Sequence, residues 1–304
     1  MPGPAPALNF DTEFDPQWGT AVPVAPGIVR ITAPNASPFT FKGTNSYLIG
    51  NDSPVVVDPG PDSDPHLEAL LAAIGKRKLE AILLTHTHND HCALAKRLHQ
   101  ATGAPLWFGG RHRLSRQKKL FEINPIARSS DWSLVPDRTL SDGDTIDLKG
   151  MSLTVIATPG HCANHLAFGI NGTPFILTGD HVMGWNSTLV AVPDGSMRDY
   201  LESLEKLEAS SWTFYLPAHG GSIVRGKRYA EALKAHRLHR NDQIIAALQS
   251  GPKSTRALLD LIYPDLPPRV RFAARMTLGA HLEYLIETGT ISATGLLGRR
   301  YTAI

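Results

Sequence analysis

The sequence predicts an α/β fold that carries a helical domain at its C-terminal end. Short apolar runs alternate with segments of helical periodicity, which is typical of sheets covered by helices. Four of the apolar runs end in a histidine or an aspartate, and at three of these ends that residue adjoins a glycine. The balance of charge changes sign near residue 225, where long helical segments replace the alternation.

Composition and charge set the broad class. Of the 304 residues, 42% are hydrophobic and 19% are charged, which is typical of a globular protein. Residues 225–304 hold 13 Lys and Arg against 6 Asp and Glu, whereas residues 1–224 hold 17 against 22. A basic module behind an acidic one indicates two domains. It also favours an anionic partner, although solvated helix faces produce similar imbalances.

The sequence predicts a cytoplasmic protein without a membrane partner. No stretch approaches the ~18 apolar residues of a membrane-spanning helix, and the first residues do not resemble a secretory signal. Two cysteines are too few for a disulfide framework. The oligomeric state is not predicted. We expect a Pro-rich leader over residues 1–25, a catalytic domain over 26–225 and a C-terminal domain over 226–304.

The order of elements follows from periodicity and turn residues. Asp64, ahead of Pro65, and Ser196 are the predicted helix N-caps, and Asn171-Gly172 predicts a hairpin. The predicted strands cover 28–31, 45–49, 54–57, 79–84, 151–157, 166–170, 174–177 and 212–216. The predicted helices cover 64–74, 94–100, 196–207, 228–248, 255–262 and 268–286.

The densest group of chemically active side chains is Thr-His-Thr-His-Asn-Asp-His at residues 85–91, directly after a buried strand. His86 and His88 are two residues apart, so their rings leave the same side of an extended chain. Asp90 lies where a helix begins. Neutral imidazole is the commonest metal ligand, so this stretch predicts a metal site, and a solvated turn is the alternative.

Three later strand ends add further ligands. His161, Asp180 and His219 each follow a predicted strand and precede or follow a glycine. Loops at the ends of strands on a rigid sheet are where sites are usually built. Together with the first stretch they supply five imidazoles and two carboxylates. This nitrogen and oxygen set suits Zn²⁺, with Fe or Mn as alternatives.

Two segments lie outside this set. Residues 111–119 hold five cations and His112, which predicts an exposed helix or lid, and an anion-binding patch is the alternative. After residue 226, three helices precede a hairpin of 290–293 with 300–303 through Gly295 and Gly298. This is the outline of a winged helix.

The ordered ligand set resembles the metallo-β-lactamase superfamily over residues 28–222, and the tail makes it similar to the lactamase-beta-2-like subgroup. The resemblance implies a four-layer αβ/βα sandwich with a metal site at one edge, followed by a C-terminal winged-helix-like helical domain. It also implies that the first cation binds His86, His88 and His161, that the second binds Asp90, His91 and His219, and that Asp180 bridges them. Asp90 and Asp180 are then the candidate catalytic residues.

The resemblance also implies a binuclear metallo-hydrolase with two Zn²⁺ ions per chain, in which metal-activated water is the nucleophile. We expect a thioester or other acyl ester as substrate, either a small molecule or bound to a carrier. The alternatives are an endoribonuclease that holds single-stranded RNA on its basic C-terminal domain, a mononuclear-iron persulfide dioxygenase, and a non-catalytic nucleic-acid-binding protein. Asp58, His165, His181 and Asn186 are expected to contact substrate or to orient ligands, and purely structural roles are the alternative.

Overall fold

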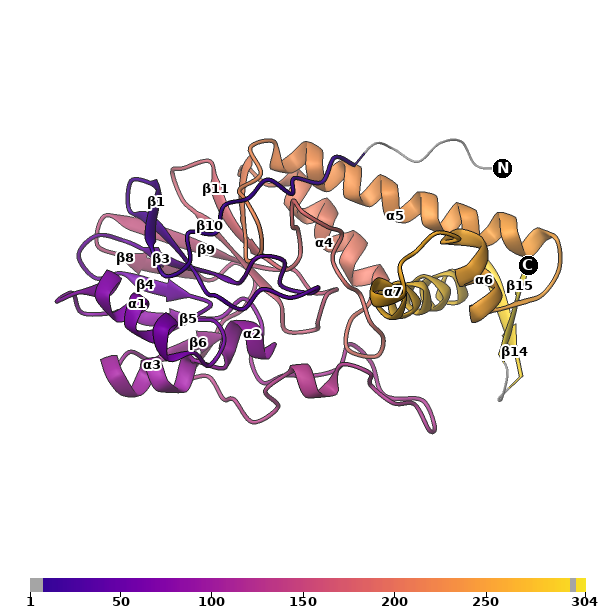
Figure 1. The fold of residues 1–304 in the computed structure, drawn as a ribbon, viewed down its shortest axis with the longest axis horizontal. Helices are drawn as coiled ribbons and strands as arrows, with labels where there is room; N and C mark the ends of the chain where they lie inside the picture. The colour runs from indigo at the N-terminus through magenta and orange to yellow at the C-terminus, as the bar shows by residue number, and fades with distance from the viewer. Residues whose placement is uncertain (1–7, 296–298) are drawn as a thin grey trace.

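The computed structural model describes residues 8–295 and 299–304. Two β-sheets pack face to face at one end of the long axis, and a helical extension occupies the other end (Figure 1). The α/β class predicted from the sequence is confirmed. None of the described helices has an apolar stretch long enough to cross a bilayer.

The first sheet has seven strands in the order of the chain, antiparallel from β1 to β4 and parallel from β4 to β7. Its strands are β1 (Ala21–Ala25), β2 (Ile28–Thr32), β3 (Asn45–Ile49), β4 (Val55–Val57), β5 (Ala81–Leu83), β6 (Leu106–Phe108) and β7 (Arg138–Thr139). Helices α1 (Asp64–Ile74) and α3 (Ala95–Thr102) form the crossovers on either side of β5.

The second sheet has five strands in the order β12-β11-β10-β9-β8. These are β8 (Thr145–Leu148), β9 (Met151–Ala157), β10 (Leu166–Ile170), β11 (Phe175–Gly179) and β12 (Phe214–Pro217). The predicted hairpin through Asn171-Gly172 is confirmed, since β10 and β11 pair antiparallel. Helix α4 (Met197–Ala209) connects β11 to β12, which pair parallel.

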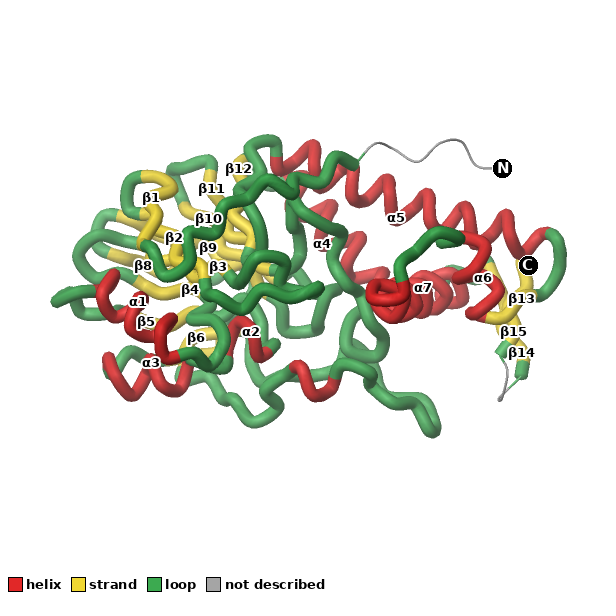
Figure 2. Tube along the Cα trace, viewed as in Figure 1, coloured by secondary structure: helices red, strands yellow, loops and turns green. Residues whose placement is uncertain are grey.

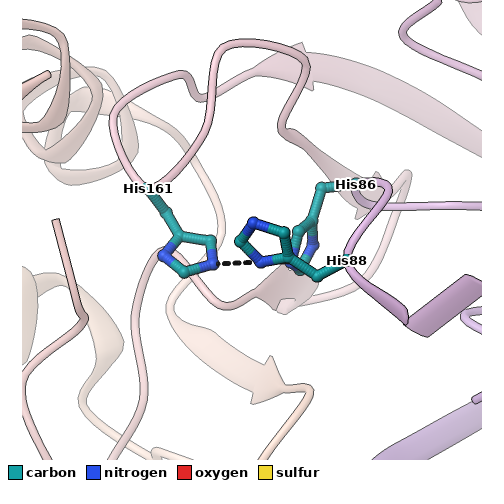
Figure 3. A group of neighbouring side chains, drawn as sticks. All are labelled: His86, His88 and His161. Carbon is teal, nitrogen blue, oxygen red and sulfur yellow. Dashed lines mark hydrogen bonds between the residues drawn. The ribbon is translucent and has the colours of Figure 1, made fainter. Parts of the chain in front are cut away.

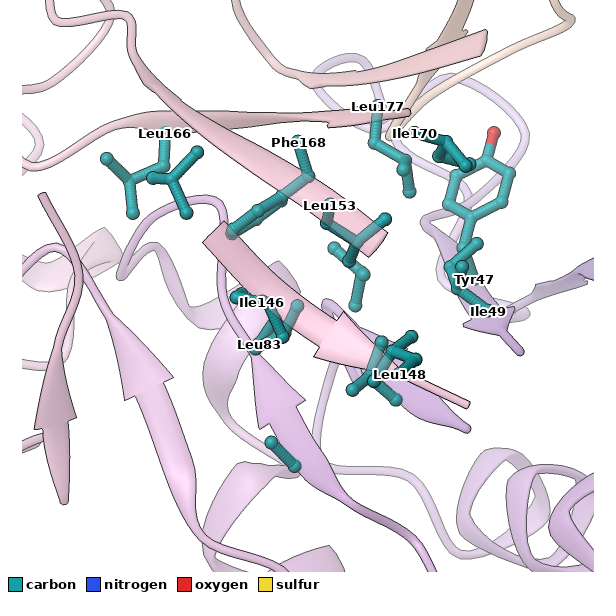
Figure 4. Close-up of a cluster of buried hydrophobic side chains, with 14 of the residues drawn as sticks. Tyr47, Ile49, Leu83, Ile146, Leu148, Leu153, Leu166, Phe168, Ile170 and Leu177 are labelled. Carbon is teal, nitrogen blue, oxygen red and sulfur yellow. The ribbon is translucent and has the colours of Figure 1, made fainter. Parts of the chain in front are cut away.

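Three apolar clusters join these parts into four layers. Between the sheets, Leu83 of the first packs with Phe168 and Leu153 of the second (Figure 4). Val57 belongs to the same cluster. Burying each such side chain contributes about 1.5–3 kcal/mol. A second cluster packs α1 and α3 on the outer face of the first sheet. A third packs α4 and α5 (Gly226–Gln249) on the outer face of the second, so the sandwich is helix, sheet, sheet, helix.

The C-terminal part has the winged-helix outline that was predicted (Figure 2). Its helices are α5, α6 (Thr255–Ile262) and α7 (Pro268–Glu287). Its small sheet has the order β13-β15-β14, formed by β13 (Lys253–Ser254), β14 (Ile291–Thr294) and β15 (Arg300–Ala303). These elements share a core of their own that includes Ile244 and Leu282. Gly298 of the predicted hairpin lies outside the described residues.

Two predicted boundaries were wrong. The first sheet begins with β1 inside the segment expected to be a loose leader. Pro23 is compatible with this strand because β1 lies at the edge of the sheet, where a missing N–H is tolerated. The N-cap of α1 is Ser63 rather than Asp64, and the Ser63 side chain accepts a hydrogen bond from the backbone N–H of His66. Ser196 caps α4 as predicted.

Residues 111–119 were predicted to form an exposed helix or lid. The helix does not form, and the segment is an irregular connection. Three of its five cations, Arg113, Arg116 and Lys119, bond to separate partners elsewhere in the chain. Arg113 donates to the backbone carbonyls of Gly109 and Ala163. Arg116 forms ion pairs with Glu122 and with Glu283 of α7, and thereby joins the connection to the C-terminal helices.

Candidate metal centre

Four strand ends deliver the predicted ligands to one edge of the sandwich. The chain leaves β5 and reaches His86 and His88, and the short helix α2 (Asn89–Cys92) then turns Asp90 and His91 toward the same place. His161 follows β9, Asp180 follows β11 and His219 follows β12. The structure therefore brings all seven predicted side chains together.

The first group consists of three imidazoles (Figure 3). The Nδ1 atom of His88 lies 3.0 Å from the Nε2 atom of His86 and 2.9 Å from the Nε2 atom of His161. A tetrahedral ion with Zn–N bonds of about 2.0–2.1 Å holds its nitrogens roughly 3.3 Å apart. The three nitrogens are thus spaced nearly as the ligands of one metal ion.

The hydrogen bonds on the far side of each ring fix which nitrogen carries the proton. His161 donates from Nδ1 to the backbone carbonyl of Leu189 at 2.7 Å. His88 donates from Nε2 to the Asp194 carboxylate at 3.3 Å. His86 donates from Nδ1 to the hydroxyl of Thr85 at 3.0 Å, because that hydroxyl gives its own hydrogen to the carboxylate of Asp58.

Each inner nitrogen of this group is therefore left with a lone pair that points at the other two. A neutral imidazole nitrogen without a hydrogen is only an acceptor, so the three cannot satisfy one another with hydrogen bonds. Three converging lone pairs repel unless a positive charge lies between them. The donor set and its tautomers accordingly fit a bound cation.

The second group consists of Asp90, His91 and His219. The Oδ2 atom of Asp90 lies 3.3 Å from Nε2 of His219 and 3.5 Å from Nε2 of His91. The outer nitrogens are again occupied, because His91 donates from Nδ1 to Asp58 at 3.0 Å and His219 donates from Nδ1 to the carbonyl of Gly43 at 3.2 Å. This group has the same inward-facing arrangement.

Asp180 lies between the two groups. Its Oδ2 atom is 3.7 Å from Nε2 of His161, and its Oδ1 atom is 3.3 Å from Nε2 of His219 and 3.5 Å from Nε2 of His91. Within the described part of the chain, Asp180 Oδ1, His91 Nε2 and His219 Nε2 are buried without a hydrogen-bond partner. An unsatisfied buried polar group costs about 1–3 kcal/mol, so three of them at one point indicate a site built for a ligand.

The two groups differ in their electrostatics. In the first, burial lowers the pKa of His161 to about 4 and that of His86 well below its usual value, so both rings are neutral at pH 7. In the second, burial also opposes the charged form of His219, but Asp180 and Asp90 outweigh it and raise its pKa to about 9. The pKa of His91 is raised in the same way.

The donor set contains nitrogen and oxygen only. Cys92 and Cys162 follow predicted ligands in the sequence, but both thiols are free and buried. Burial raises the pKa of Cys92 to about 12 and that of Cys162 well above its usual value, so neither supplies a thiolate at pH 7. Imidazole and carboxylate ligands suit Zn²⁺, Fe or Mn.

Two of the four residues expected beside the ligands lie there. Asp58 accepts from the N–H and the hydroxyl of Thr85, each at 2.7 Å, and from His91, so it orients ligands of both groups. His165 accepts from the backbone N–H of Asp180 at 3.2 Å and contacts the Thr158 hydroxyl at 2.8 Å.

The other two lie elsewhere. His181 is fully buried against the ring of Tyr200, at 4.6 Å between ring centroids. Among the described residues its nitrogens have no hydrogen-bond partner, so it neither orients a ligand nor faces solvent. Asn186 is exposed and accepts from the backbone N–H of Ser187, which makes it a local loop cap. The sequence placed both near the site only because they follow Asp180.

Sequence reasoning missed Asp194 and His112. The buried Asp194 carboxylate accepts from His88 at 3.3 Å, from Nε2 of His112 at 2.8 Å and from Asn124 at 3.3 Å. The other nitrogen of His112 lies 2.9 Å from the hydroxyl of Thr87. Asp194 stands in Pro-Asp-Gly, which resembles a turn, and His112 stands in a run of cations. Neither pattern indicates a buried partner.

The comparisons with known proteins agree with this geometry. The Metallo-beta-lactamase superfamily profile matches residues 39–219, and the profile of the Beta-lactamase associated winged helix domain matches residues 254–299. A Caenorhabditis elegans protein named Beta-lactamase-like protein 2 homolog is 28% identical over 87% of this chain and 85% of its own length. An Aspergillus fumigatus protein named Atrochrysone carboxyl ACP thioesterase is 26% identical over 78% of this chain and 70% of its own length.

Solved structures show the same fold. The crystal structure of a metallo-beta-lactamase family protein from Thermus thermophilus matches with a TM-score of 0.75 and 28% identity. The match covers 93% of this chain and 100% of that one. The chain therefore belongs to the metallo-beta-lactamase superfamily and carries the associated winged helix domain at its C-terminal end.

Proposed function

We propose that this protein is a hydrolase that holds two Zn²⁺ ions and cleaves the thioester of an acyl group. Membership of the superfamily indicates metal-dependent hydrolysis. The observation that carries the proposal is the common orientation of five imidazoles. Each ring donates its outer N–H to a carboxylate, a backbone carbonyl or the hydroxyl of Thr85. Each ring also turns its inner nitrogen toward the neighbouring imidazoles or toward Asp180.

The proposed ligand sets are those of the two groups. His86, His88 and His161 would hold one ion, Asp90, His91 and His219 would hold the other, and Asp180 would contribute one oxygen to each. When bound, such a pair lowers the pKa of water toward ~7 and polarises a carbonyl oxygen. The protein contributes the fixed positions of these ligands, because their outer hydrogen bonds prevent the rings from turning.

Asp90 is the residue best placed to orient the attacking water. Its side chain is 29% exposed, whereas the side chain of Asp180 is 9% exposed and that of His219 is fully buried. Burial favours its neutral form, but His91 and His219 outweigh burial and hold its pKa well below the usual range. An ionised carboxylate at the solvent side of the site can accept a hydrogen bond from water and aim its lone pair at the substrate.

A carrier-bound acyl thioester is the proposed substrate class. The support comes from the relatives, since those named Atrochrysone carboxyl ACP thioesterase are 26–28% identical to this chain over 75–80% of its length. A thioester carbonyl needs a nucleophile and an oxyanion stabiliser, and both would come from the proposed site.

The test is a hydrolysis panel run on the full chain. Acyl-pantetheine and acyl-carrier thioesters, a lactone, a phosphodiester and single-stranded RNA are each incubated with the purified protein, with and without a chelator. We expect thioester cleavage that a chelator abolishes and added Zn²⁺ restores. Thioester cleavage that persists in the metal-free protein would refute the proposal.

An endoribonuclease is the second candidate, and the charge of residues 225–304 favours it. Phosphate contacts make nucleic-acid binding strongly dependent on salt. RNA cleavage that falls steeply with added salt, in the absence of thioester cleavage, would establish this candidate instead. A single iron atom per chain would favour the persulfide dioxygenase. Nucleic-acid binding without any turnover would favour the non-catalytic alternative.

A further inference from the structure

Helix α5 carries one charged residue on its buried face. Ala230, Leu233, Ile244 and Leu248 lie on that face at helical spacing and pack into the apolar cores. Arg237 occupies the middle of the same stripe and is only 3% exposed. Burying a guanidinium costs several kcal/mol unless its hydrogens find partners, so its contacts have to account for its position.

Arg237 contacts the loop that follows Asp180. Its guanidinium donates from Nη2 to the backbone carbonyl of Thr188 and lies over the ring of Tyr200, 5.2 Å from the centroid, whereas its Nε is buried without a hydrogen-bond partner among the described residues. No carboxylate forms an ion pair with it in residues 8–295 and 299–304. The charge is therefore directed at a backbone carbonyl, and a charged donor makes such a bond about twice as strong as a neutral one.

A second residue of α5 holds the same loop. The hydroxyl of Tyr229, eight residues before Arg237 and thus close to the same face of the helix, donates to the carbonyl of Gly184 at 3.1 Å. The connection between β11 and α4, residues 180–196, is consequently attached to α5 at two points, Gly184 and Thr188.

This loop in turn holds two members of the proposed metal centre. The hydroxyl of Thr188 contacts the backbone carbonyls of Asp180 at 2.7 Å and of His181 at 3.0 Å. The next carbonyl along the chain, that of Leu189, accepts the outer N–H of His161 and so sets the tautomer and direction of that ring. One short segment therefore supports the backbone of Asp180 and the ring of one histidine of the first group.

We infer that Arg237 is a positioning residue of the metal centre, which acts through Thr188 and Leu189 on Asp180 and His161. Helix α5 then belongs to the metal site, although it contributes no ligand. The inference rests on the proposed metal binding. The competing account is that Arg237 only attaches the C-terminal helices to the sandwich, and it predicts a loss of stability without a change at the metals.

The experiment compares variants of the full chain. Arg237→Met keeps an apolar stem over Tyr200 but removes the donor, and Arg237→Lys restores a charged donor. Arg240→Met is the matched control, because Arg240 lies on the same helix, covers the ring of Tyr263 and bonds to Gln243, all within the C-terminal part. Thr188→Val removes the hydroxyl that holds Asp180 and leaves α5 untouched.

Two readouts separate the accounts. Competition with a chromophoric chelator gives the apparent Zn²⁺ affinity without any substrate, and the visible spectrum of the Co²⁺-loaded protein reports ligand geometry. Thermal unfolding of the metal-free variants measures the purely structural effect. We expect Arg237→Met to weaken Zn²⁺ binding about tenfold, which is the smallest loss of affinity usual when a residue that supports metal ligands is replaced. We also expect it to shift the Co²⁺ spectrum. Arg237→Lys should recover part of the affinity, and Arg240→Met should bind as the parent does.

The inference is overturned if folded Arg237→Met binds Zn²⁺ like the parent, or loses no more affinity than Arg240→Met. If Arg237→Met does not fold, Thr188→Val decides. Weaker binding in Thr188→Val supports the inference, and parental binding overturns it. A parent protein that binds no metal at all would instead refute the proposed function, so the two failures are distinguishable.

Discussion

The two halves of the proposed metal centre are built from different chemistry. The half made by His86, His88 and His161 contains only imidazoles, and burial keeps His86 and His161 neutral. The half made by Asp90, His91 and His219 includes a carboxylate, and the neighbouring charges raise the pKa of both histidines. The first half therefore offers lone pairs at neutral pH, whereas the second must release protons before a cation can bind.

The largest expected effect follows from removing the residue that the two halves share. Asp180→Ala leaves the converging nitrogens without their common carboxylate, so we expect fewer than two ions per chain and a fall in kcat/KM of about 10³-fold. The estimate assumes that the metals contribute several kcal/mol of transition-state stabilisation, and that each 1.4 kcal/mol lost slows the reaction about tenfold. Elemental analysis and thioester kinetics check this. Asp142→Ala is the control, since Asp142 is exposed and lies outside the two groups. It pairs with Lys206 and accepts a hydrogen bond from the backbone N–H of Ala157. Unchanged metal content in Asp180→Ala would show that this carboxylate is not a shared ligand.

Single histidine variants should separate the halves. His88→Ala removes a ligand of the first half and His219→Ala one of the second, so each should retain about one ion and lose roughly 10²-fold in activity. Metal content after dialysis measures this. His99→Ala on α3 is the control, because within residues 8–295 and 299–304 the His99 ring bonds only to the carbonyl of Ala104. Loss of both ions from either variant would mean that the halves do not bind independently.

The pH dependence of metal binding should also differ between the halves. The folded pKa of His219, about 9, exceeds the ordinary value of 6.5, so at pH 7 a metal must displace its proton. The apparent affinity of the second half should therefore rise with pH until about 9, by up to about tenfold per unit for each proton displaced. His161, with a pKa of about 4, should release no proton. Calorimetric titrations in buffers of different ionisation enthalpy measure the protons released.

The same raised pKa has a consequence for the metal-free protein. The folded state holds a proton on His219 that the unfolded state releases above pH 6.5. This contribution to stability is therefore complete below about pH 6.5 and is lost as the pH rises through about 9.

Metal binding that is independent of pH between 6 and 9 would contradict the assigned difference between the halves.

The smallest expected effect comes from the carboxylates behind the ligands. Asp58 bonds to His91 and, through Thr85, to His86, whereas Asp194 bonds only to His88 among the proposed ligands. Asp58→Asn should weaken binding in both halves by about tenfold, and Asp194→Asn should weaken it in the first half only. Stepwise chelator competition resolves the two ions. If Asp194→Asn weakened the binding of both ions equally, the proposed difference between Asp58 and Asp194 would be contradicted.

The positions that could be predicted are those with a local signature. The ligands stand at the ends of apolar runs, and the side chains near strand ends on one edge of a sandwich converge whatever the details of the loops. The α/β alternation, the hairpin at Asn171-Gly172 and the winged-helix outline follow from periodicity and turn residues in the same way, whereas the four-layer sandwich was implied by the family resemblance. The assignment of individual side chains to each metal stays a prediction.

The positions that could not be predicted depend on distant partners. Asp194 lies 106 residues from His88, and nothing near either residue indicates the pairing. Arg237 stands in a basic helix, where one buried cation has the same local pattern as its exposed neighbours. At residues 111–119 a run of cations favoured an exposed helix or lid. No helix forms there, and Arg116 pairs with Glu122 and with the distant Glu283.

The metal content of the purified chain tests the central claim most directly. Elemental analysis of protein saturated with Zn²⁺ and freed of unbound ions should give two zinc atoms per chain, and one in His88→Ala. Two bound ions would show that both halves of the centre are ligand sets. A parent chain that retains no metal, or that retains a single iron and no zinc, would contradict the account.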